Sequence, residues 1–94
     1  MFTWINKCGA QSSSGFIVEH VGLRSMLYRE DGKSLELYAE SYFSSGELNT
    51  DIWQSEINKW KNGTIINDID QARIIENIRA ALRFMDTELT VNAS

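Results

Sequence analysis

The chain has 94 residues and a mass of 10.7 kDa; 43% of its residues are hydrophobic and 23% are charged. This is the composition of one globular domain, and it excludes collagen-like, coiled-coil and disulfide-rich scaffolds. The net charge of −4, from 9 basic and 13 acidic residues, repels phosphate. It therefore argues against nucleic-acid binding and favours a basic protein as partner.

Three features predict the compartment. Cys8 is the only cysteine, so it has no partner for an intramolecular disulfide, which suits a reducing cytoplasm. The first ten residues have neither the basic region nor the long apolar region of a secretory signal. No apolar run reaches the ~18–20 residues of a membrane-spanning helix, so we expect a cytoplasmic protein without membrane contact.

The N-terminal part predicts strands separated by a polar loop. Residues 2–5 and 16–21 are rich in aromatic and β-branched residues, which is typical of strands. Between them, residues 9–15 (GAQSSSG) are small and polar and predict a loop. We therefore interpret residues 1–14 as an N-terminal strand and loop, and residues 15–92 as the core of a single domain spanning residues 1–94.

A β-hairpin is predicted over residues 23–40. Asp31-Gly32 supplies the two positive-φ positions of a two-residue type I′ turn, so Glu30 should face Lys33. Side chains alternate along a strand, and this register therefore separates two faces. The expected core face holds Met26, Tyr28, Leu35, Leu37 and Ala39. The expected outward face holds Ser25, Leu27, Glu36, Tyr38 and Glu40.

Residues 51–60 (DIWQSEINKW) fit two patterns. As a strand they would point Trp53 and Ile57 inward, whereas Trp53, Ile57 and Trp60 also recur at helical spacing. We favour the strand. Before this segment, Ser44-Ser45-Gly46 resembles a loop.

One amphipathic helix is predicted over residues 69–85, with Asp68 as N-cap and Gln71 completing a capping box. Its apolar stripe consists of Ile74, Ile75, Ile78, Ala81, Leu82 and Met85. A short strand follows at residues 87–92, with Leu89 and Val91 on one side. These elements predict an α+β fold: a single two-layer domain with an approximately five-stranded, mainly antiparallel sheet and the helix packed across one face.

The sequence offers little catalytic chemistry. A structural zinc site needs several His or Cys ligands, and the chain has one of each, His20 and Cys8. We interpret His20 as a partly exposed strand residue and Cys8 as an incidental thiol without a flanking histidine. The loop at residues 9–15 lacks the Gly-Lys-Ser/Thr ending of a phosphate-binding loop. We therefore assign no catalytic residue, no metal and no cofactor.

The outward hairpin face is the better candidate for binding. Tyr38 lies between Glu36 and Glu40, and Tyr42, Phe43, Glu47, Asp51 and Trp53 follow. An aromatic ring can anchor a partner while acids steer a basic surface toward it. The predicted partner-binding residues are Glu36, Tyr38, Glu40, Glu47 and Asp51. The alternative is that Tyr42 and Phe43 only close the edge of the core.

Several segments together resemble a known family. They are residues 15–24 (GFIVEHVGLR), 27–30 (LYRE), 34–40 (SLELYAE), Ile57 with Trp60, residues 66–70 (INDID) and 73–84 (RIIENIRAALRF). This pattern, over residues 15–92, resembles small immunity proteins of bacterial polymorphic-toxin and contact-dependent growth inhibition systems. The resemblance implies a cytoplasmic, non-catalytic protein that binds and neutralises the C-terminal toxin domain of a cognate effector. Such toxins are often nucleases, which suits an acidic inhibitor.

Two other functions stay open at this stage. The chain could be a small homodimeric ligand-binding or regulatory module, although nothing in the sequence indicates a homo-oligomer. It could also be a small hydrolase that uses His20 and an acid.

Overall fold

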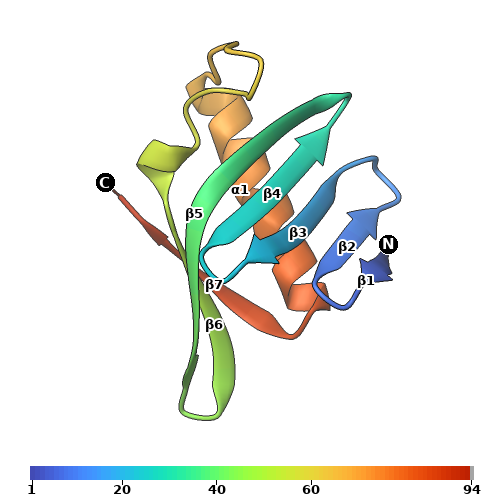
Figure 1. The fold of residues 1–94 in the computed structure, drawn as a ribbon, viewed down its shortest axis with the longest axis vertical. Coiled ribbons are helices and arrows are strands. Elements are labelled where there is room, and N and C mark those ends of the chain that lie inside the picture. The colour runs from blue at the N-terminus through green and yellow to red at the C-terminus, as the bar shows by residue number, and fades with distance from the viewer. Residues whose placement is uncertain (94) are drawn as a thin grey trace.

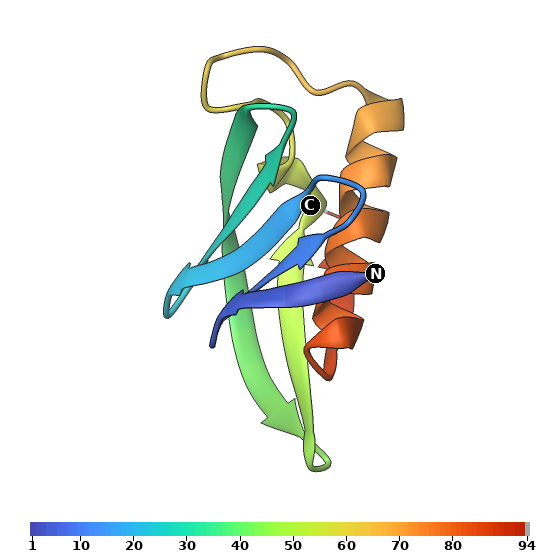
Figure 2. The ribbon, with the colours of Figure 1, turned by 90° about the vertical axis from the view of Figure 1, so that its right-hand side faces the viewer.

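A single curled sheet of seven strands wraps around one side of a long helix in the computed structural model, which describes residues 1–93 (Figures 1 and 2). The strands are β1 (Phe2–Asn6), β2 (Gly9–Ser12), β3 (Ile17–Gly22), β4 (Ser25–Glu30), β5 (Lys33–Ser44), β6 (Glu47–Trp53) and β7 (Thr87–Asn92). A short 3₁₀ helix, η1 (Gln54–Glu56), and the helix α1 (Asp68–Phe84) lie between β6 and β7. The α+β class is confirmed.

The strand order in the sheet is the order in the chain. Neighbours from β1 to β6 pair antiparallel, whereas β7 pairs parallel to β6 after the crossover through α1. Sequence reasoning expected about five strands and missed β2, which occupies most of the predicted loop. Gly9 and Ala10 are buried there, and a side chain on Gly9 would come within 3.0 Å of Glu19 and Ile5. The small residues that suggested a loop instead allow close packing of strands.

The predicted hairpin is confirmed as β4–β5. Asp31 and Gly32 have φ values of 49° and 75°, as a type I′ turn requires, and Glu30 pairs with Lys33. All five residues of the expected core face are buried. Strand β4 begins at Ser25, two residues later than predicted, because Leu23 and Arg24 form the turn from β3.

The prediction of a strand over residues 51–60 is wrong beyond Trp53. Strand β6 ends there, and the chain turns through η1 before Ile57 and Trp60 enter the core. The inward positions of β6 are Thr50 and Ile52, which places Trp53 on the opposite face of the sheet.

Helix α1 lies across the concave side of the sheet (Figure 2). Asn67, one residue before the predicted cap, accepts a hydrogen bond from the Asp70 N–H at 2.8 Å and is the N-cap. Asp68 is the first helical residue instead. The buried part of the predicted stripe consists of Ile74, Ile78, Ala81 and Leu82, which pack against the sheet core. The C-terminal strand is confirmed as β7 with Leu89 buried.

Candidate functional site

The five predicted binding residues lie on one face of the sheet. We call it the outer face, because it is the side of β4–β6 turned away from α1. Ala39 and its partner Ile52 point into the core, so the next pair, Glu40 and Asp51, points outward. The same alternation places Glu36, Tyr38 and Glu47 on this face. The structure therefore brings together residues from two strands.

Two carboxylates stand directly opposite each other on the outer face. Glu40 and Asp51 are cross-strand partners, an arrangement of like charges that destabilises a sheet. Each carboxylate accepts a hydrogen bond from a tyrosine: Tyr38 donates to Glu40, and Tyr42 donates to Asp51 at 2.9 Å. These bonds are the main reason why the pKa values of Tyr38 and Tyr42 are raised. The tyrosines hold the two charges in fixed positions on the exposed sheet.

An aromatic pair borders these charges. The rings of Tyr38 and Trp53 lie 5.2 Å apart at 48°, and the Tyr38 N–H donates to Glu56 at 3.3 Å. Glu56 is a member of the face that sequence reasoning missed, and Trp53 was noted near the face but was not included among the predicted binding residues. The positions of Trp53 and Glu56 depend on where β6 ends. The sequence predicted a continuous strand over residues 51–60, in which Trp53 would point inward.

The remaining two predicted residues lie toward opposite ends of the face. Glu36 accepts a hydrogen bond from the Ser25 hydroxyl at 2.7 Å, beside β4. Glu47 pairs with Ser44 at the tip of the β5–β6 hairpin. Glu88 of β7, opposite Asn49, extends the acidic surface on the other side of β6. The outer face is therefore a mainly acidic strip with aromatic side chains at its centre, where Arg24 is a basic group beside Tyr38.

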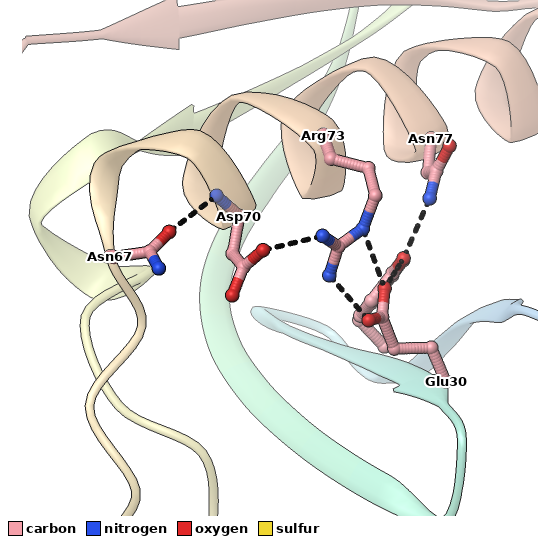
Figure 3. Close-up of polar contacts among 6 residues, drawn as sticks. Glu30, Asn67, Asp70, Arg73 and Asn77 are labelled. Atoms are coloured by element: carbon pink, nitrogen blue, oxygen red, sulfur yellow. Dashed lines mark hydrogen bonds and ion pairs between the residues drawn. The ribbon is translucent and has the colours of Figure 1, made fainter.

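A second polar cluster joins the start of α1 to the end of β4 (Figure 3). The Tyr28 hydroxyl donates to Glu30 at 2.6 Å and accepts from Asn77 at 2.8 Å. Arg73 forms ion pairs with both Glu30 and Asp70. Burial, followed by the bond to Glu30, raises the pKa of Tyr28, and the bonds to Asp70 and Glu30 raise that of Arg73.

This cluster borders a polar cavity of about 530 Å³, which Lys33 and Ser14 also line. The charges of Arg73 and Glu30 are already paired with each other, and Asp70 is paired with Arg73. The arrangement stabilises the contact between helix and sheet more readily than it binds a ligand.

The only cysteine, Cys8 in the β1–β2 turn, lies beside the only histidine, His20 of β3, and the sequence did not reveal this contact. The backbone N–H of His20 donates a hydrogen bond to the backbone carbonyl of Cys8 at 2.9 Å, and both residues line a cavity of about 390 Å³. Burial lowers the pKa of His20. The register that joins them depends on β2, the strand that was predicted as a loop. Within residues 1–93, no group of three or more His, Cys, Asp or Glu residues is placed to hold a metal.

No family model matches the chain, and comparison with curated proteins and with solved structures gives no significant match. Among the described residues, no helix combines the length and the apolar character needed to cross a membrane.

Proposed function

We propose that the chain is an immunity protein, which binds a cognate bacterial toxin domain through the outer face and neutralises it without catalysis. The observation that supports this most directly is the opposed pair Glu40 and Asp51. Tyr38 fixes the carboxylate of Glu40 and Tyr42 fixes that of Asp51. These two opposed like charges weaken the isolated sheet, and a basic partner would relieve their repulsion.

The aromatic pair at the centre of the face supports the same function. Tyr38 and Trp53 offer a rigid apolar contact, and carboxylates beside such a contact are typical of a steered protein interface. The proposed partner is a basic toxin domain of the nuclease kind. The proposed site of action is the cytoplasm, where the thiol of Cys8 would stay reduced.

An immunity gene is expected to follow its toxin gene directly, so the test takes the toxin domain from that position and measures association and dissociation rates at low and high salt. We expect the double variant Glu40→Gln with Asp51→Asn to associate at least tenfold more slowly at low salt, with a smaller effect at high salt, because screening removes steering. We expect Tyr38→Ala to act mainly on dissociation, since a buried anchor is lost as the complex separates.

Glu76→Gln is the matched control, because this carboxylate lies on the solvent side of α1, away from the outer face. It should bind like the parent. If the outer-face variants are folded and also bind like the parent at both salt concentrations, the outer face is not the interface. If no binding to the toxin domain is found at all, the proposed function is wrong.

A further inference from the structure

An exposed turn in the connection between η1 and α1 carries chemistry that the outer face does not use. It covers residues 60–64 (WKNGT) and lies at the top of the molecule in Figure 1. The Trp60 N–H donates to the Thr64 carbonyl, and the Gly63 N–H donates to the Trp60 carbonyl, both at 2.9 Å. Gly63 has φ of +94°. The turn is therefore a three-residue hairpin loop with glycine at its left-handed position.

Asn62 precedes this glycine, and it is the only one of the seven asparagines in the chain that does so. The main-chain nitrogen of the residue after an asparagine can attack Cγ of the asparagine side chain and close a succinimide ring. A side chain on that next residue obstructs the attack, and glycine has none. Residues 61–65 are all exposed, so water can reach the ring once it has formed.

The side-chain amide of Asn62 is polarised, and its nitrogen is unrestrained. Oδ1 accepts a hydrogen bond from the Thr64 N–H at 2.9 Å, which stabilises negative charge on Oδ1 when Cγ is attacked. Within residues 1–93, Nδ2 of Asn62 donates no hydrogen bond. Four other asparagines donate this nitrogen to a partner, namely Asn6, Asn49, Asn77 and Asn92. The nitrogen that departs from Asn62 is therefore free to leave.

The attacking nitrogen, in contrast, is restrained. It must lose its proton when it bonds to Cγ, and in the closed turn the Gly63 N–H is donated to the Trp60 carbonyl. The Lys61 N–H donates to the Ser34 carbonyl at 2.8 Å and fastens the same turn to the start of β5. The attack therefore requires a local opening that breaks the hydrogen bond from Gly63 to Trp60.

We propose that Asn62 is a site of spontaneous deamidation and that opening of the 60–64 turn sets its rate. The Gly63 nitrogen bonds to Cγ of Asn62, the Cγ–Nδ2 bond breaks, and the proton of the Gly63 nitrogen leaves with Nδ2 as ammonia. Water then hydrolyses the succinimide at either of its carbonyl carbons, which leaves aspartate or isoaspartate at position 62. This proposal does not depend on the proposed function.

The isoaspartyl product changes the main chain as well as the charge. Its main chain runs through the former side chain, which inserts an additional carbon atom into the turn. The lengthened turn no longer matches the two hydrogen bonds that close it at Trp60. Because Trp60 is buried in the core, we expect the isoaspartyl form to unfold at a lower denaturant concentration than the unmodified chain.

The test incubates the purified folded chain at mildly alkaline pH and follows every asparagine by peptide mass spectrometry, with an isoaspartyl methyltransferase assay to separate isoaspartate from aspartate. We expect Asn62 to convert before any other asparagine. Isoaspartate should be among the products, because direct hydrolysis of the amide would give aspartate alone. In the same chain unfolded by guanidinium chloride, conversion should be about tenfold faster or more, since the turn is open throughout.

Asn58→Gln is the matched control. Asn58 is exposed in the same connection but precedes Lys59, so its replacement should leave the conversion of Asn62 unchanged. Asn62→Gln should remove the conversion at position 62, because the longer side chain closes the corresponding ring far more slowly.

Three results would overturn the proposal: another asparagine that converts first in the folded chain, aspartate as the only product at position 62, or equal rates in the folded and unfolded chains. So would a folded chain in which Asn62 stays intact while the unfolded chain converts.

Discussion

Arg73 in α1 forms an ion pair with Glu30 at the end of β4, and the two residues are 43 positions apart in the chain. Glu30 also accepts a hydrogen bond from the hydroxyl of Tyr28, whose ring is buried in the core. One carboxylate therefore joins the first half of the helix to the hairpin on which the outer face is built (Figure 3).

The buried hydroxyl of Tyr28 should contribute measurably to stability. Tyr28→Phe removes a donor to Glu30 and an acceptor for Asn77, and leaves both groups short of a partner. We expect the free energy of unfolding to fall by about 1–3 kcal/mol, measured by urea denaturation. Tyr42→Phe is the control, because its hydrogen bond to Asp51 is exposed to water. A similar loss in both variants would contradict a special role for the buried hydroxyl.

The turn between β4 and β5 should depend on glycine. Gly32 has φ of +75°, a conformation that costs an L-residue roughly 1–2 kcal/mol, so Gly32→Ala should destabilise the chain by that amount. Gly22→Ala should change stability little, since Gly22 has no positive φ and a new Cβ would meet its nearest neighbour at 3.9 Å. Equal losses in urea denaturation would show that the turn conformation is not the cause.

Stability should fall as the pH decreases from about 7 to 5.5. Burial lowers the pKa of His20 in the folded chain below its ordinary 6.5, so unfolding takes up a proton in this range. The stabilising contribution of neutral His20 is complete above about pH 6.5, which is its pKa in the unfolded chain. It is lost as the pH falls from there toward the lower pKa of His20 in the folded chain. Because His20 is the only histidine, His20→Gln should make the free energy of unfolding nearly independent of pH in this window. An unchanged slope would assign the pH dependence to other groups.

Relief of the repulsion at the outer face should stabilise the isolated chain. Asp51→Asn removes one of the two opposed carboxylates and keeps an acceptor for Tyr42. We expect a slightly higher urea midpoint at low salt, and no gain at about 1 M salt, where the Debye length is about 3 Å. A loss of stability at both salt concentrations would show that Glu40 and Asp51 do not repel each other appreciably.

The sequence predicted those parts of the fold that are specified locally. The Asp31-Gly32 turn sets the register of β4–β5, and through it the alternation that places Glu36, Tyr38 and Glu40 on the outside. The helix and its buried stripe follow from a spacing that is visible along the chain. Both signals depend on neighbours within a few residues.

The remaining features depend on contacts between distant residues. Gly9 and Ala10 form a strand because β1 and β3 pair with it on both sides, and no local preference shows this. The position of Trp53 depends on where β6 ends, and β6 ends where its pairing with the parallel strand β7 ends. The backbone contact between Cys8 and His20 joins segments whose proximity only the complete sheet creates.

The parallel pairing of β7 with β6 has a consequence for folding. Strands β1 to β6 are joined by turns of two to four residues, so five antiparallel pairings can form by local closure. The pairing of β7 must wait until the whole crossover from Trp53 to Thr87 has been closed, which is entropically slower. During synthesis the concave side of the sheet emerges before the helix that covers it. Trp60, which is buried within this crossover and packs against Tyr28 and Lys33 of the β4–β5 hairpin, should therefore report the packing of the crossover onto the sheet in refolding experiments rather than the formation of the sheet.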